Sequence, residues 1–157
     1  LINCNLPHLK SKLTKLISRL KQSNIEILWD LQIHQLDNSI PSIKDEAILY
    51  EEFLSPKIYL SLTNDTNTAI QTINQYSWGH SASIISNNID NAKKFQEQVD
   101  CAVVYHNAST RFSDWWELWL WWEIAISTQK LHARWPISIN QLMTNKWFIY
   151  WNGQIRK

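Results

Sequence analysis

Short apolar runs alternate with amphipathic stretches along most of this chain, and this alternation constrains the fold more than any other feature. Short segments rich in apolar residues are typical of strands, and they occur at 25–28, 57–62, 82–85 and 101–105, of which the last is continuously apolar. Between them, apolar residues recur at helical spacing, which predicts helices over 8–22, 65–75 and 89–99. We expect residues 30–50 to be irregular. Strands that alternate with helices favour an α/β fold, a mainly parallel sheet with flanking helices.

Length and composition indicate one ordinary domain and exclude several function classes. The 157 residues are 45% hydrophobic, which is enough to bury a core. The formal net charge of +1 argues against a nucleic-acid partner. No apolar run approaches the roughly 18 residues of a spanning helix, so we expect no membrane partner. Cys4 and Cys101 suggest neither a disulfide framework nor a metal site, and they favour the reducing cytoplasm.

A polar segment follows the strand predicted at 101–105. Ligands of parallel α/β sheets bind beyond the carboxyl ends of the strands, so this segment is where we expect the substrate. Arg111 can hold a carboxylate or a phosphate through two parallel hydrogen bonds. Asn107, Ser109 and Thr110 can add neutral hydrogen bonds, although these residues could instead only cap the following turn.

Tryptophan is in excess and glycine is scarce. The chain has 10 Trp and 2 Gly, whereas average usage of about 7% predicts roughly 11 glycines. Five tryptophans fall within 114–123, and four more stand beside predicted turns, at Trp29, Trp78, Trp135 and Trp151. Reading these nine as glycine would restore an ordinary composition. We therefore hypothesise that UGA codons, read as glycine in the source organism, stand here as tryptophan. Taken literally, the same residues would suggest a non-enzymatic Trp-rich module that binds a membrane interface or carbohydrate.

With glycine in those places, segment 107–136 closely resembles the carboxy-terminal signature of the γ-glutamyl phosphate reductase family. This family, also called glutamate-5-semialdehyde dehydrogenase, belongs to the aldehyde dehydrogenase superfamily. Segments 51–54, 76–80 and 151–156 are similar to further family segments. The resemblance runs over the whole chain and is strong from Ala102 onward.

The resemblance implies an oxidoreductase of proline biosynthesis. Such an enzyme reduces L-glutamyl 5-phosphate to L-glutamate 5-semialdehyde with NADPH and releases phosphate. A cysteine thiolate attacks the acyl phosphate in this chemistry. Cys4 is followed by Asn5, as the family's nucleophile is followed by Asn, but the next residues depart from the pattern. We expect the nucleophile upstream of Leu1, and therefore no activity from this chain alone.

Two further residues receive roles from the resemblance. Glu52 corresponds to the superfamily's glutamate that contacts the nicotinamide ribose, and His80 could face the substrate. For each, a purely structural or surface role is the alternative.

The resemblance also divides the chain. Residues 1–142 are expected to be the carboxy-terminal part of an aldehyde dehydrogenase-like catalytic domain, with a cofactor-side segment near 51–56. Residues 143–157 are expected to form an oligomerisation strand and tail, so we expect a homo-oligomer. A last helix is predicted over 136–146 and a last strand over 147–151.

Overall fold

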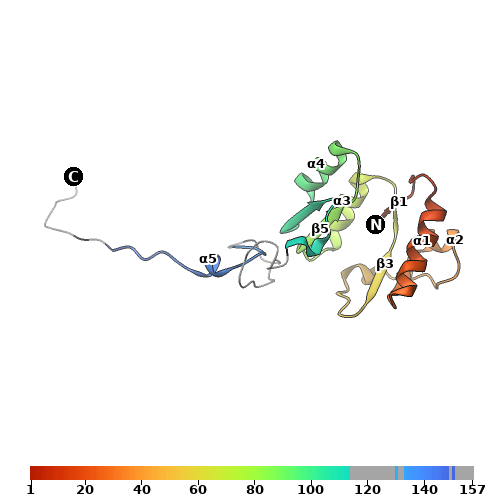
Figure 1. Cartoon of the computed structure of the whole chain (residues 1–157), viewed down its shortest axis with the longest axis horizontal. Coiled ribbons are helices and arrows are strands. Elements are labelled where there is room, and N and C mark those ends of the chain that lie inside the picture. The colour runs from red at the N-terminus through yellow and green to blue at the C-terminus, as the bar shows by residue number, and fades with distance from the viewer. Residues whose placement is uncertain (114–129, 131–132, 149, 151–157) are drawn as a thin grey trace.

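The computed structural model describes residues 1–113, 130, 133–148 and 150. Helices and strands follow one another along this part of the chain (Figure 1), with bounds β1 (Ile2–Asn3), α1 (Leu9–Gln22), β2 (Glu26–Trp29), α2 (Leu31–Leu36), the 3₁₀ turn η1 (Glu46–Tyr50), β3 (Lys57–Leu60), β4 (Leu62–Thr63), α3 (Thr66–Tyr76), β5 (Ser81–Ile84), α4 (Ile89–Gln98), β6 (Val103–His106), the 3₁₀ turn η2 (Thr110–Ser113) and α5 (Ile139–Leu142). The predicted alternation of strands and helices is confirmed.

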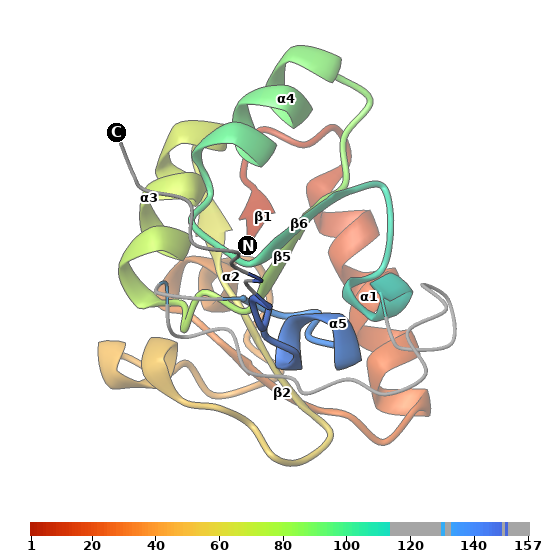
Figure 2. The same cartoon turned by 90° about the vertical axis from the view of Figure 1, so that its left-hand side faces the viewer.

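The described strands pair two by two, and each pair is parallel. β1 pairs with β4, β2 with β3, and β5 with β6. The α/β fold with parallel strands and flanking helices is therefore confirmed. α1 and α3 lie on opposite sides of the strands (Figure 2).

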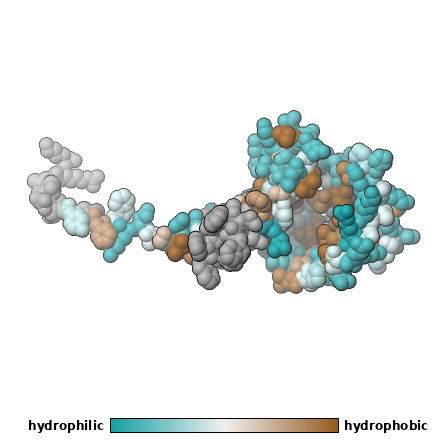
Figure 3. Space-filling model, viewed as in Figure 1, coloured by the Kyte–Doolittle hydropathy of each residue, from teal (hydrophilic) through white to brown (hydrophobic). Residues whose placement is uncertain are grey.

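Two apolar cores hold these elements together. The first lies between α1, α2 and the β2–β3 pair, and its buried side chains are Leu13, Ile17, Ile27, Trp29, Ile33 and Leu60. The second lies between α3, α4 and β5, and contains Ile70, Ala82, Phe95 and Val99. In Figure 3 the exposed face of α1 is hydrophilic, while apolar side chains gather between α1 and the part of the chain that contains α3 and α4. Each core faces one strand pair, so the chain is organised as two packed units.

Two predictions at the carboxy-terminal end were wrong. The helix predicted over 136–146 is only the single turn α5, which Ser138 and Gln141 begin with a reciprocal capping box and which gives way to extended backbone at Met143. The described residues of the predicted last strand, at 147, 148 and 150, are not in a strand; 149 and 151 lie outside the described residues. Residues 143–148 instead extend away from the body (Figure 1).

The expectation that 30–50 is irregular was also wrong in part. α2 and η1 lie within it, and each begins at an aspartate. Asp30 Oδ1 accepts from Ile33 N at 2.8 Å, and Asp45 Oδ1 accepts from Ala47 N at 2.9 Å. Aspartate is among the preferred residues at helix N-caps, because its carboxylate satisfies an otherwise unpaired backbone N–H. These caps outweigh the weak apolar periodicity of the segment.

Trp29 does not occupy the turn that its sequence position suggested. It closes strand β2, is 0% exposed, and donates from Nε1 to Ile40 O at 2.8 Å. The described tryptophans Trp29, Trp78, Trp135 and Trp147 are absent from the described residues with positive φ, whereas Gly79 beside Trp78 has φ 71°. At these four positions the backbone therefore gives no reason for glycine.

Among the described residues, no helix combines the length and the apolar character needed to span a membrane.

Asp30 ties the first core to the strands beside it. Its Oδ1 caps α2, its Oδ2 accepts from Leu62 N at 3.0 Å, and its own N–H donates to Leu60 O at 3.1 Å. One half-buried side chain therefore fixes the end of β2, the start of α2 and the junction between β3 and β4.

Replacing Asp30 by alanine leaves two backbone N–H groups without their acceptor. We expect D30A to lower the free energy of unfolding by about 3 kcal/mol, and D30N to cost less because its amide oxygen still caps α2. Urea unfolding of the chain measures both. Asp37, whose Oδ1 accepts from Ser39 N in an exposed turn, is the matched control. Equal losses in D30A and D37A would contradict this role for Asp30.

Candidate functional site

The carboxyl ends of β5 and β6 meet at one edge of the fold. The strands are in register from Ser81 opposite Val103 to Ile84 opposite His106, so the loops that follow them, 85–88 and 107–113, begin side by side. The sequence predicted a substrate site after the strand that became β6, and the structure places that segment at this edge.

Hydrogen bonds hold the two loops together. Asn107 N donates to Ile84 O at 2.8 Å. The Asn107 side chain accepts from Ser86 N at 2.9 Å and donates to Ser86 O at 3.1 Å. The Ser83 hydroxyl donates to Ala108 O at 2.7 Å. The start of the candidate loop is therefore fixed to the end of β5 before the chain reaches Arg111.

A short turn presents the remaining candidates. The Ser109 hydroxyl accepts from Arg111 N at 3.2 Å, and Phe112 N donates to Ser109 O at 3.0 Å, which begins η2. Ser109 thus has the capping role that the sequence offered as an alternative. Thr110 and Arg111 are exposed on this turn. The structure brings Asn107, Ser109, Thr110 and Arg111 together at one edge.

His80 is not brought to that edge. It precedes β5, at the opposite end of a strand that spans roughly 13 Å. Its ring lies against the buried Trp135 with centroids 4.5 Å apart, and its Nδ1 is 3.3 Å from the Ser81 hydroxyl. These contacts are those of a packed, half-buried histidine.

Glu52 is exposed in the connection between η1 and β3. Contacts with the end of α3 hold the preceding turn in place. The rings of Tyr50 and Tyr76 meet edge to face at 5.0 Å, and Trp78 Nε1 donates to Tyr50 O at 3.1 Å. Glu52 therefore follows a turn that is packed against the end of α3.

The two cysteines differ in their surroundings. Cys4 Sγ donates to Asn64 Oδ1 at 3.4 Å. Burial raises the pKa of the Cys101 thiol, against smaller opposing effects of the Ser77 hydroxyl and Arg134. A raised pKa leaves less thiolate at neutral pH, so Cys101 is poorly suited to act as a nucleophile.

The segment before α5 is anchored at the amino end of β5. Arg134 donates from Nη2 to Gly79 O at 2.7 Å, and its Nη1 lies 3.7 Å from Asp100 Oδ1. Lys130 also binds Asp100, and its hydrogen bond is the main cause that lowers the pKa of this carboxyl. Arg134 thus holds backbone and carboxylate within the fold. Glu117, Glu123, His132 and the tryptophans at 115–122 lie outside the described residues.

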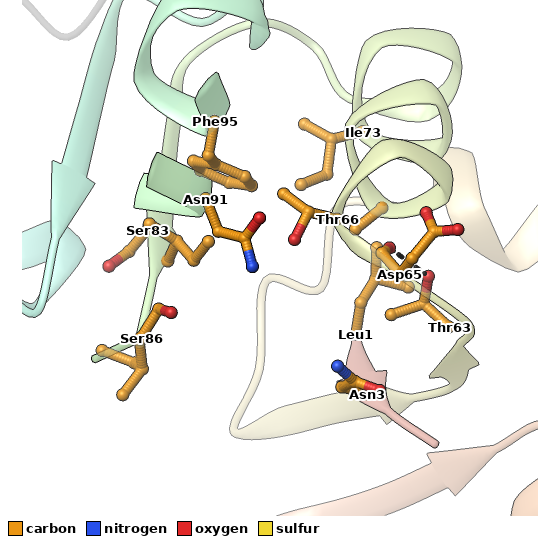
Figure 4. Close-up of a pocket in the computed structure, with 13 residues that line it drawn as sticks. Leu1, Asn3, Thr63, Asp65, Thr66, Ile73, Ser83, Ser86, Asn91 and Phe95 are labelled. Atoms are coloured by element: carbon orange, nitrogen blue, oxygen red, sulfur yellow. Dashed lines mark hydrogen bonds between the residues drawn. The ribbon is translucent and has the colours of Figure 1, made fainter. Parts of the chain in front are cut away.

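A cavity of about 360 Å³ opens beside the loop that follows β5 (Figure 4). Ser83, Ser86, Asn91 and Phe95 line one side, and the opposite side comes from β1, β4 and the start of α3, with Asn3, Thr63, Asp65 and Thr66. Asp65 is the only ionisable side chain in this lining among the described residues, and the N–H of Thr68 holds the pKa of its carboxyl below the usual value. A negative carboxylate disfavours an anion here, so Arg111 remains the candidate for anion binding.

The described residues contain no group of three or more His, Cys, Asp or Glu side chains placed to hold a metal ion.

Sequence reasoning missed Ser83 and Ser86 as parts of this edge, and it placed His106 in the polar segment without a role of its own. His106 closes β6, and its Nε2 lies 2.8 Å from Ser86 O. Ser86 contributes through its peptide group, which no side-chain pattern reveals. The sequence feature that could have indicated this junction is Asn107. Its amide can accept and donate at once, and asparagine tolerates a left-handed backbone.

Comparison with known proteins supports the resemblance seen in the sequence. A model of the aldehyde dehydrogenase family matches residues 39–115. Gamma-glutamyl phosphate reductase of Clostridium botulinum (strain Alaska E43 / Type E3) is 45% identical over 144 residues, which is 92% of this chain and 34% of that protein. The Lachnospira eligens protein of the same name is 42% identical over 149 residues, covering 94% and 35%. The crystal structure of gamma-glutamyl phosphate reductase from Thermotoga maritima superposes with a TM-score of 0.84 at 33% identity, over 94% of this chain and 36% of that one.

Residues 39–115 match the aldehyde dehydrogenase family, and the aldehyde dehydrogenase-like fold of the chain is confirmed. Within that family it is similar to the gamma-glutamyl phosphate reductases, as the sequence resemblance indicated. It spans about a third of the length of these curated relatives. The matches favour the enzyme interpretation over the Trp-rich binding module.

Proposed function

We propose that this chain is the carboxy-terminal part of a γ-glutamyl phosphate reductase. Such an enzyme reduces L-glutamyl 5-phosphate to L-glutamate 5-semialdehyde and releases phosphate in proline biosynthesis. One observation carries the proposal: an exposed arginine stands on a hydrogen-bonded turn at the carboxyl edge of the β5–β6 pair. The similarity to reductases of that name along 92% of the chain supports it.

The substrate explains why an arginine suits this turn. L-Glutamyl 5-phosphate carries a phosphate at one end and a carboxylate at the other. A guanidinium binds either group through two parallel hydrogen bonds. Arg111 would hold one of these anions, while Thr110, exposed on the same turn, would add a neutral hydrogen bond.

The reaction class also needs a thiolate and a hydride donor. Neither cysteine in this chain is proposed as the nucleophile, because burial raises the pKa of the Cys101 thiol and the residues that follow Cys4 and Asn5 depart from the family's pattern. We propose that a cysteine before Leu1 supplies the thiolate, so this chain alone is inactive. A nicotinamide cofactor, NADPH in this proposal, supplies the hydride when bound. The exposed Glu52 carboxylate fits the role of accepting hydrogen bonds from its ribose.

Two further features of the proposed enzyme concern its surroundings. Trp147 is 83% exposed and Phe148 is 69% exposed, in a segment that leaves the body (Figure 1). Such apolar exposure is costly in water, so we propose that a second copy of the chain covers residues 143–157. Cys4 and Cys101 are both free thiols, which supports the cytoplasm as the compartment.

Replacing Arg111 tests the proposed site. In the longest form of the protein that its gene encodes, NADPH formation from the semialdehyde, phosphate and NADP⁺ follows the reverse reaction. We expect R111A to raise one KM by roughly tenfold or more, since a hydrogen-bonded charge pair is lost. A change in the KM of phosphate assigns Arg111 to the phosphate, and a change in the KM of the semialdehyde assigns it to the carboxylate.

The control is K93A, which removes a positive charge from the exposed face of α4 and should leave both KM values unchanged. R111A with both KM values unchanged would contradict the proposed role of Arg111. If the unaltered enzyme forms no NADPH in a phosphate-dependent reaction, the proposed function itself is contradicted.

We also propose that most tryptophans here are glycines in the protein made by its source cells. The support is compositional, because nine such replacements restore ordinary glycine usage. The tryptic peptide 112–130 contains five of the nine positions and no internal cleavage site, so its mass tests the proposal directly. We expect the mass of the glycine form.

Two other tryptic peptides sharpen this measurement. Peptide 147–156 holds Trp147, expected to remain tryptophan, and Trp151, expected to be glycine, so fragment masses supply an internal control. Peptide 22–44 holds the buried Trp29, where the turn argument does not apply. Tryptophan throughout 112–130 would contradict recoding.

A further inference from the structure

Asn107 bends the chain out of β6. Its φ is 54°, in the left-handed region, and it shares this conformation with His8 and Asn24 among the described non-glycine residues. Asparagine adopts this region more readily than most residues. The bend sends the backbone from the strand toward the turn that carries Arg111.

The side chain of Asn107 is committed to protein contacts. Its oxygen accepts from Ser86 N at 2.9 Å, and its nitrogen donates to Ser86 O at 3.1 Å. The Asn107 amide therefore binds both the N–H and the carbonyl oxygen of Ser86, which fixes the plane of the amide as well as its position. The His106 ring, 2.8 Å from the same carbonyl oxygen, meets Ser86 from the neighbouring position.

The contacts continue without a break from Asn107 to Arg111. Ser83 Oγ donates to Ala108 O at 2.7 Å, one residue after the bend. The Ser109 hydroxyl then accepts from Arg111 N at 3.2 Å. The backbone of Arg111 is therefore placed, relative to β5, by contacts that begin at Asn107.

We propose that Asn107 is a positioning residue, which sets the place of Arg111 through Ser86 and does not itself bind substrate. This inference rests on the proposed function. It assigns Asn107 a different role from the direct substrate contact that its sequence position suggested. The Ser83 hydroxyl reinforces the same arrangement.

A double-mutant cycle separates positioning from contact, because a residue that acts only through Arg111 loses its effect once Arg111 is gone. N107G keeps the left-handed backbone at no steric cost and removes the amide. In the longest form of the protein, we expect N107G to raise the KM affected by R111A by roughly tenfold, the effect of losing two hydrogen bonds. In the R111A background we expect the same substitution to change that KM less than twofold.

The matched control is N24G, which makes the same change at another left-handed asparagine, in the turn between α1 and β2. It should leave KM unchanged. S83A provides a second, milder test if N107G does not fold: it removes the Ala108 contact, and we expect a smaller KM increase that also vanishes with R111A.

Each outcome decides between the possibilities. Equal KM factors for N107G with and without Arg111 would overturn the proposal and assign Asn107 to the substrate. If N107G does not fold, equal KM factors for S83A with and without Arg111 would overturn the proposal, because the contacts of this loop would then not act through Arg111. If the tested substitution leaves KM unchanged while R111A raises it, the positioning role is overturned and the proposed role of Arg111 stands. If R111A itself has no effect, the proposed function of Arg111 fails and the positioning role fails with it.

Discussion

The peptide group of Ser86 joins the loops that follow β5 and β6, and the candidate site depends on this junction. A parallel pair brings two carboxyl ends to one edge, but it does not determine how the chain continues beyond them. Asn107 and His106 meet Ser86 from the β6 side, and Ser83 reaches back across to Ala108. The turn that carries Arg111 begins from this fixed point, so an exposed cation has a defined place at the edge of the fold.

Most of the fold could be predicted from sequence because its signals are local. Apolar segments and helical periodicity specify β2, β3, β5, β6 and the three long helices, and the rhythm of these elements specifies parallel pairing. The short elements were missed for a physical reason: α2 and η1 depend on single aspartate caps rather than on periodicity. α5 was predicted too long, since Ser138 begins it but no apolar face sustains it beyond Leu142.

The site was only partly predictable. Its location after β6 follows from the general behaviour of parallel sheets, and the sequence drew Asn107 and Arg111 together by proximity along the chain. The difference in role between them did not follow, because it depends on a long-range contact with the Ser86 backbone. His80 shows the converse: its identity suggested a substrate contact, whereas its place against Trp135 at the amino end of β5 could come only from three-dimensional packing.

The central claim is that an arginine on this turn binds an anion of the substrate. A crystal structure of the longest form of the protein with bound L-glutamate 5-semialdehyde and phosphate tests it most directly. We predict that a phosphate or carboxylate oxygen lies within hydrogen-bond distance of the Arg111 guanidinium, while the Asn107 amide stays on Ser86. Both anionic groups bound by other residues, with Arg111 in solvent, would contradict the account.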